Sequence, residues 1–310
     1  MDFADGITVN NNGSCYVIGT TNSTNFPTKN AYQGSFAGNN DAFVVKFSAG
    51  CSLLWSTYLG GTAHDQGNSI DVDKNNGNCY VIGATDSTDF PTLNAYQSTP
   101  SENSDAFISK FSTSGSLLWS TCLDGESYAY GLGIAINSID GSCYVTGSTD
   151  STDFPTKNAY QSTYGGGDSD AFISKFSANG SLLWSTFLGG ESYEVSKNIA
   201  VDSSDGSCCV TGDTGSSNFP TLNAYQSAYG GGAADAFITK LSEPSPPPTT
   251  TTPPPTTTPP PTTTTPPPTT PTTSETSSPT SSNTISGLLL FLGVISILGV
   301  LFLVMKRRRL

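Results

Sequence analysis

Residues 105–121 read Asp-Ala-Phe-Ile-Ser-Lys-Phe-Ser-Thr-Ser-Gly-Ser-Leu-Leu-Trp-Ser-Thr and contain two apolar runs on either side of a glycine-containing turn. The first run, Ala-Phe-Ile-Ser-Lys-Phe, is mostly apolar and contains one Ser and one Lys. The second run is dominated by Leu and Trp. Short runs of this kind joined by such a turn predict an antiparallel β-hairpin. This hairpin decides the fold because the chain repeats it.

The repeats cover residues 1–242, with a period of 64 or 65 residues. Asp-Ala-Phe begins at Asp41, Asp105, Asp170 and Asp235, and Phe-Pro-Thr begins at Phe26, Phe90, Phe154 and Phe219. The three tryptophans stand in copies of Leu-Leu-Trp-Ser-Thr, at Trp55, Trp119 and Trp184. The units span about 5–64, 65–129, 130–194 and 195–242. The fourth unit enters a Pro/Thr-rich segment before any Leu-Leu-Trp-Ser-Thr copy.

Each unit also contains a second hairpin upstream of the first. An apolar run such as Ile199 to Val201 meets a turn of Asp, Ser and Gly, and a second run follows, as in Cys79-Tyr-Val-Ile-Gly83. Each unit is therefore predicted to form four antiparallel strands. A four-stranded blade cannot bury both faces alone, so such units stack around an axis. The sequence predicts an all-β fold, a β-propeller of four repeated four-stranded blades closed into a ring, with the last blade incomplete.

The repeated motifs resemble one known family. The pattern Gly-x-Cys-Tyr-Val-x-Gly-x-Thr, Phe-Pro-Thr, Asp-Ala-Phe, Lys-Phe and Leu-Leu-Trp-Ser-Thr-x-Leu-Gly-Gly resembles the SBBP-type β-propeller repeat of prokaryotic surface proteins. The resemblance covers about residues 5 to 242. It implies the propeller fold and a location on the cell surface, and it supplies no shared catalytic residue.

The rest of the chain reads as an anchor. Residues 243–284 alternate Pro and Thr runs, which predicts a disordered, extended stalk. Residues 285–305 are 21 uncharged, mostly apolar residues, enough for a single transmembrane α-helix. The basic tail 306–310 follows, so the C-terminus is expected in the cytoplasm and the propeller outside. No Leu-Pro-x-Thr-Gly motif is present, and cleavage by a sortase-like enzyme is the weaker alternative.

Charge excludes several classes of function. Before residue 285 the chain carries 25 acidic residues and eight lysines, a net charge of −17, with no arginine and one histidine. This balance argues against nucleic acid or anionic lipid as a partner. His64 stands alone, without a second His for a metal site or a nucleophile elbow for a Ser-His-Asp site. We therefore predict an exposed loop histidine, no metal site and no catalytic residue.

Strand direction predicts where a ligand binds. Both short hairpin turns of each unit lie on one rim, so the long second-to-third loops and the fourth-to-first loops share the opposite rim, where binding is expected. Candidate binding residues there are Asp65, Glu126, Glu191 and Glu194. The leading interpretation is a non-enzymatic display or adhesion module that contacts an extracellular protein or glycan. The alternative is an extracellular polysaccharide hydrolase or lyase that uses these carboxylates.

The remaining motifs have structural interpretations. We expect two sets of repeated aromatic residues to pack between blades: Trp55, Trp119 and Trp184, and Phe43, Phe107, Phe172 and Phe237. Four cysteines at equivalent positions are expected to be small buried residues without bridges: Cys15, Cys79, Cys143 and Cys208. Pairing among Cys51, Cys122 and Cys209 is left open. Asn12, Asn22 and Asn179 form possible N-glycosylation sites.

Two further points concern cofactors and the start of the chain. The turns 73–77 and 202–206 resemble calcium loops but lack the glutamate that ends such loops. We interpret them as hairpin turns, expect no cofactor, and keep calcium binding as a minor hypothesis.

No basic and apolar leader precedes the first strand, although export would require one. We therefore expect an upstream segment that supplies a signal peptide and the missing strand.

Overall fold

A computed structural model describes residues 1–242 and 301–305, and this part of the chain is all-β. It contains no helix long and apolar enough to cross a membrane. The predicted stalk, residues 285–300 of the predicted membrane segment and the basic tail lie outside the described residues.

In the described residues, sixteen strands form four sheets, each with four strands in chain order and antiparallel to their neighbours. The first sheet contains β1 (Asp2–Val9), β2 (Cys15–Thr21), β3 (Asp41–Phe47) and β4 (Leu53–Leu59). The second contains β5 (Asp65–Val72), β6 (Cys79–Thr85), β7 (Asp105–Phe111) and β8 (Leu117–Leu123). The third contains β9 (Ala129–Asn137), β10 (Ser142–Thr149), β11 (Asp170–Phe176) and β12 (Leu182–Leu188). The fourth contains β13 (Glu194–Asp202), β14 (Ser207–Thr214), β15 (Asp235–Leu241) and β16 (Leu301–Met305).

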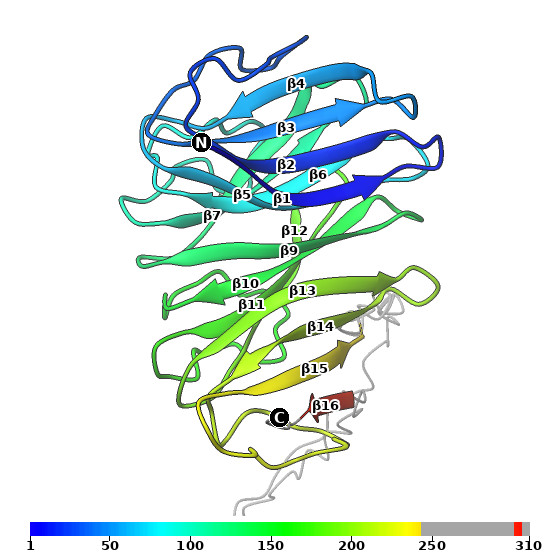
Figure 1. Cartoon of the computed structure of the whole chain (residues 1–310). Coiled ribbons are helices and arrows are strands. Elements are labelled where there is room, and N and C mark those ends of the chain that lie inside the picture. Colours follow the sequence, from blue (N-terminus) through cyan, green and yellow to red (C-terminus); the bar gives the residue numbers. More distant parts are fainter. Residues whose placement is uncertain (243–300, 306–310) are drawn as a thin grey trace, which may run out of the picture. The chain divides into compact units, whose positions relative to one another are not determined.

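The sheets lie in a row in the order of the chain, each packed on the next (Figure 1). The first strands of successive sheets contact one another along one side of the row. The predicted four-stranded units and the two kinds of rim are confirmed, because the antiparallel order places the long loops opposite the short turns.

The predicted ring closure is wrong for the described part of the chain. Figure 1 shows the first and fourth sheets at opposite ends of the row. One physical reason lies on the outer face of the fourth sheet, where Cys209 and Thr211 are exposed. In the strand register these two positions correspond to Tyr16 and Ile18 in β2 and to Tyr80 and Ile82 in β6. Those four side chains are buried against the next sheet. The fourth sheet therefore lacks the buried Tyr that the other three sheets have at the position of Cys209, namely Tyr16, Tyr80 and Tyr144.

The expectation of an incomplete fourth blade also needs correction. Leu301–Met305 forms β16, which pairs antiparallel with β15 in the place of the missing Leu-Leu-Trp-Ser-Thr strand. These five residues were predicted to end a transmembrane helix. An apolar run without Pro or charge is compatible with strand pairing, and β15 offers an unpaired edge. The rest of the predicted helix lies outside the described residues.

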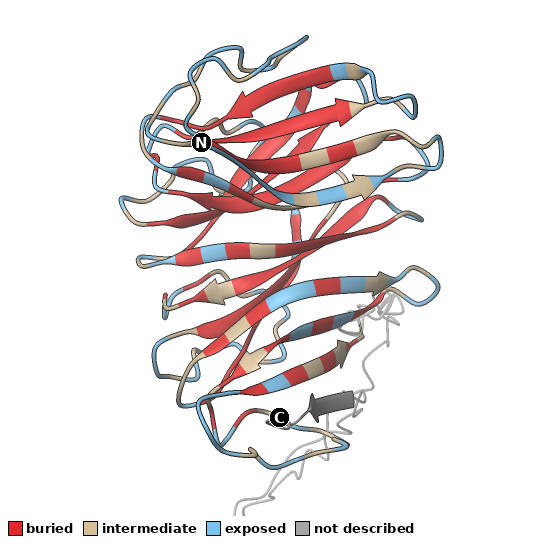
Figure 2. Cartoon of the chain, in the orientation of Figure 1, coloured by how far each residue is buried: buried red, intermediate tan, exposed pale blue. Residues whose placement is uncertain are grey.

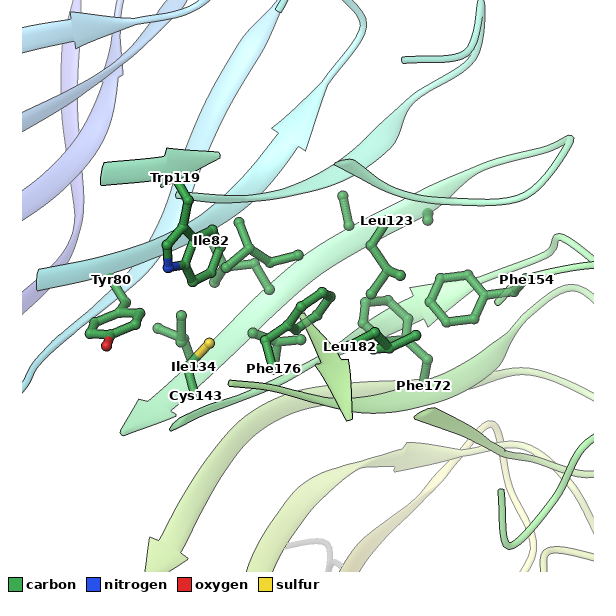
Figure 3. Close-up of a cluster of buried hydrophobic side chains, with 14 of the residues drawn as sticks. Tyr80, Ile82, Trp119, Leu123, Ile134, Cys143, Phe154, Phe172, Phe176 and Leu182 are labelled. Atoms are coloured by element: carbon green, nitrogen blue, oxygen red, sulfur yellow. The ribbon is translucent and has the colours of Figure 1, made fainter. Parts of the chain in front are cut away.

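The first two interfaces between sheets repeat one set of contacts. Trp119 of β8 is 3% exposed, stacks on Phe176 of β11 at 6.3 Å between ring centroids, and donates its indole N–H to the Ala178 carbonyl at 3.1 Å. Lys110 donates to the same carbonyl, at 2.8 Å. Figure 3 shows Trp119, Phe176 and Leu182 within one apolar cluster between the second and third sheets. The same indole and ammonium contacts join Trp55 and Lys46 to Thr113.

The two outer faces of the row differ. The first sheet exposes an apolar hollow of about 260 Å³, lined by Val17, Phe43, Phe47 and Leu53 among others. In the fourth sheet, β14 and β15 alternate buried residues with exposed or half-buried ones along their length (Figure 2). The fourth sheet has a hollow of about 290 Å³ beside Phe237 and Ile238, but this one also contains the Lys197–Asp213 ion pair.

Candidate functional site

A pocket of about 250 Å³ opens in the third repeat, among the residues that begin and flank β9. Tyr128 and Tyr130 are 45% and 42% exposed, and their rings stack with centroids 6.3 Å apart and planes 3° from parallel. The other lining residues carry hydroxyl or carboxylate groups: Ser148, Thr149, Asp150, Asp168 and Ser169. We call this set the Tyr128 pocket.

Local hydrogen bonds hold the pocket in place. The Tyr128 backbone N–H donates to Asp150 Oδ1 at 2.7 Å, and the Asp150 N–H donates back to the Tyr128 carbonyl at 3.2 Å. Thr149 Oγ1 donates to the same carbonyl at 2.8 Å. The loop that carries Tyr128 is therefore tied to the end of β10. A stacked aromatic pair beside hydroxyl and carboxylate groups presents both an apolar face and hydrogen-bonding groups to a ligand.

Sequence analysis did not single out these tyrosines. The available signal was Tyr-Ala-Tyr at residues 128–130, because side chains two apart in a strand lie on the same face. At the corresponding starts of β5 and β13, Gln66 and Val195 stand where β9 has Tyr130. The stacked pair is therefore particular to the third repeat.

The four sequence-predicted binding residues are distributed over successive junctions between sheets. Asp65 and Glu194 are fully buried at the starts of β5 and β13, whereas Glu126 and Glu191 are exposed in the loops before β9 and β13. Glu191 Oε1 accepts a hydrogen bond from Ser217 Oγ at 2.7 Å. The structure does not gather the four carboxylates at one place.

Asp65 accepts hydrogen bonds from residues in the loops of the long-loop rim. Its Oδ2 accepts hydrogen bonds from the Gly61 N–H at 2.8 Å and from Ser87 Oγ at 2.9 Å. Asp41 lies beside it and accepts bonds from the N–H groups of Ala37 and Gly38, at 3.0 and 3.2 Å. Burial, together with the nearby Asp41 charge, raises the pKa of Asp65 to about 6. These acids hold the loops in position.

Acidic groups also lie beside one another at the next two junctions. Asp170 and Glu194 interact between the third and fourth sheets, and burial raises the pKa of Asp170 to about 7. Between the second and third sheets, the position of Asp65 is taken by Ala129, and a second acid, Asp124, stands where the other junctions have Gly60 or Gly189. Burial and a hydrogen bond with Asp105 raise the pKa of Asp124. Every junction thus retains two acidic groups although their positions differ.

These buried acids predict that lowering the pH stabilises the domain. Asp65 and Asp170 have folded-state pKa values of about 6 and 7, above the value of about 4 in an unfolded chain. Between those values the folded state binds more protons, so its stability increases as the pH falls from about 8 to 4. We expect a gain of about 2 kcal/mol after allowing for partial solvent screening. Chemical denaturation at a series of pH values measures this gain, Asp65→Asn should flatten the profile, and a loss of stability toward pH 5 would contradict the assignment.

The remaining sequence predictions can be placed. His64 is exposed, as are Asn12, Asn22 and Asn179, while all three tryptophans are buried. Cys79, Cys143 and Cys208 are buried free thiols, in agreement with their interpretation as small core residues, whereas Cys15 is half-buried. In the calcium-like turns, Asp73 and Asp202 accept bonds from the backbone of Asn75 and Ser204, as in ordinary Asx turns. The described residues contain no cluster of three or more His, Cys, Asp or Glu that could hold a metal.

One known protein family matches part of the repeat region. No curated protein is significantly similar to the chain. A family model described as the SBBP beta-propeller repeat matches residues 54–91, which run from β4 through the second sheet's β5 and β6 to the start of the following loop. This match confirms the resemblance drawn from the repeated motifs. The chain therefore contains a β-propeller repeat of the SBBP type.

Proposed function

We propose that this protein is a non-enzymatic binding module displayed on the cell surface, and that the Tyr128 pocket binds a neutral glycan. The observation that carries the proposal is the exposed, stacked pair Tyr128 and Tyr130 beside Asp150 and Asp168. The C–H face of a sugar ring packs on aromatic rings, and its hydroxyls donate to carboxylates.

The charge of the chain favours a neutral glycan over an acidic one. The residues before position 285 carry a net charge of −17, and the pocket itself contains two carboxylates and no cation. An anionic polysaccharide would be repelled by this surface. A neutral sugar chain meets no such barrier and uses the carboxylates as hydrogen-bond acceptors.

Surface display rests on the sequence after the repeats. The Pro/Thr-rich sequence 243–284, a composition typical of extended linkers, lies between the repeats and the apolar residues 285–305, and the basic residues that follow favour a cytoplasmic C-terminus. A stalk of this kind holds a binding domain away from the membrane.

We expect intact cells that carry the full chain to bind a fluorescent neutral polysaccharide, with soluble β-glucan, xylan and galactomannan as probes and alginate as the acidic comparison. Protease added outside the cells should remove both the probe and the repeat domain. In purified protein, Tyr130→Ala should weaken binding at least about tenfold, because one stacking face is lost.

Tyr225→Ala is the matched control, since Tyr225 is 86% exposed and lies outside the pocket. Equal loss of binding in both variants, or binding of none of the neutral probes, would argue against the glycan site. Release of reducing sugars that disappears in Glu126→Gln would instead favour the hydrolase alternative.

A further inference from the structure

The edge of β15 differs from its counterparts in the other sheets. β3, β7 and β11 each pair with a Leu-Leu-Trp-Ser-Thr strand, in which Trp119 is opposite Lys110 and Ser120 is opposite Ser109. β15 pairs instead with β16, whose register places Phe302 opposite Thr239. The fourth sheet is therefore completed by a strand of different sequence.

A buried hydroxyl is left without a partner at this edge. In the second and third sheets, Ser109 Oγ lies 2.7 Å from Ser120 Oγ and Ser174 Oγ lies 2.7 Å from Ser185 Oγ. Thr239 occupies the same position in β15 and is 0% exposed, yet its Oγ1 has no hydrogen-bond partner. Leaving a buried hydroxyl unsatisfied is costly. A strand with Ser in register would satisfy it.

Within the described residues, the long loop of the fourth repeat also lacks a pair of backbone hydrogen bonds that the other long loops form. Leu93 and Ser120 exchange two backbone hydrogen bonds, at 3.0 and 2.8 Å, and Lys157 and Ser185 do the same. Leu222 is the equivalent residue of the fourth repeat, and no such pair of bonds joins it to another residue in the described ranges. A strand with Ser at the position of Ser120 and Ser185 would supply both a backbone N–H and a carbonyl to Leu222.

A cleft of about 720 Å³ lies next to this edge. Its lining includes Thr221, Leu222 and Leu241 of the fourth repeat and Tyr160, Thr186 and Leu188 of the third. In the preceding interface, Leu182 and Phe187 from the Leu-Leu-Trp-Ser-Thr strand fill the corresponding space and are buried. The cleft therefore suits the first Leu and the Phe of such a strand.

We propose that the β15 edge, Thr239, Leu222 and this cleft form an acceptor site for a β-strand of Leu-x-Trp-Ser-Thr-Phe type from a partner polypeptide. Strand addition of this kind combines backbone pairing for affinity with pockets for alternate side chains. The three copies within residues 1–242 are each paired in their own sheets, so none is free to fill the site. The site is separate from the Tyr128 pocket.

The use of β16 and the use of the membrane segment exclude each other. Leu301–Met305 cannot both pair with β15 and complete a helix of 21 apolar residues. When residues 285–305 span a membrane, the β15 edge is left open for the partner strand.

The test uses the full chain and a fluorescein-labelled peptide with the sequence of residues 181–189. We expect saturable binding, and tighter binding in Leu303→Pro, because proline removes a backbone donor from β16. A double-mutant cycle gives the specific signature. Thr239→Ala, or replacement by Ala of the peptide serine equivalent to Ser185, should each weaken binding about fivefold, as loss of one hydrogen bond does, and the two changes together should weaken it no further.

A peptide of scrambled sequence is the control. Binding by Leu303→Pro alone still supports the site and identifies β16 as the strand that occupies it. Failure of both protein forms to bind, equal binding of the scrambled peptide, or additive effects in the cycle would each overturn the proposal. None of these outcomes bears on glycan binding, which is measured separately.

Discussion

Replacing Trp119 by Ala is expected to lower the free energy of unfolding by about 3 to 5 kcal/mol, the usual cost of truncating a buried aromatic side chain. The indole is 3% exposed, stacks on Phe176 and lies edge-on to Tyr80 at 6.0 Å. It therefore joins two sheets through one side chain. The substitution also removes one of the two donors to the Ala178 carbonyl.

Leu118→Ala is the matched control for Trp119→Ala, because Leu118 is the neighbouring residue in β8 and is 38% exposed. Its cost should be much smaller. Chemical denaturation followed by circular dichroism measures both variants without depending on tryptophan fluorescence. Unchanged stability of Trp119→Ala together with lost glycan binding would show that the tryptophans are ligand contacts.

Gly83→Ala is expected to destabilise the domain by about 3 kcal/mol through overpacking. A Cβ at this position would lie 1.9 Å from the Gln66 carbonyl oxygen of β5 and 2.7 Å from the Phe107 ring. Backbone and ring must both move to make room. The same close approach recurs at Gly147, where the nearest carbonyl oxygen, that of Tyr130, would be 1.8 Å away.

The control for Gly83→Ala is Gly34→Ala, since no atom lies within 4 Å of a Cβ built on Gly34. Thermal unfolding of the two variants should differ by many degrees. A destabilisation of similar size in both would mean that the close contact with β5 does not determine the effect.

Local patterns in the sequence predicted most of the sheet structure. The two apolar runs around a turn in residues 105–121, and their recurrence every 64 or 65 residues, define the hairpins, because strand pairing within a blade connects near neighbours. The blade-like sheets and the long-loop rim followed from strand direction alone. The burial of Trp119 was also predictable, since the tryptophan follows two leucines in each of the three copies of its motif.

Other features depend on contacts that no local pattern encodes. Lys46 and Lys110 are 6% and 7% exposed, because each places its ammonium group on a carbonyl of the next sheet and over a tyrosine ring. A lysine in an alternating strand would ordinarily be assigned to solvent. The pairing of β16 with β15 joins segments about 60 residues apart in sequence. The stacked pair in the Tyr128 pocket was missed because only one repeat carries it.

The unequal ends of the row also determine how copies of the chain can meet. The hollow at one end is lined by apolar residues such as Phe43, Phe47 and Leu53, whereas the hollow at the other end, beside Phe237 and Ile238, also contains the charged residues Lys197 and Asp213. Head-to-tail contact would set the apolar hollow against a face that carries the Lys197–Asp213 ion pair, and removing these charges from water is costly. Two copies that meet through the hollows around Phe47 form a two-fold symmetric pair and leave the ends that carry Lys197 and Asp213 outside. Association through this face is thereby self-limiting, and it does not propagate into a fibre.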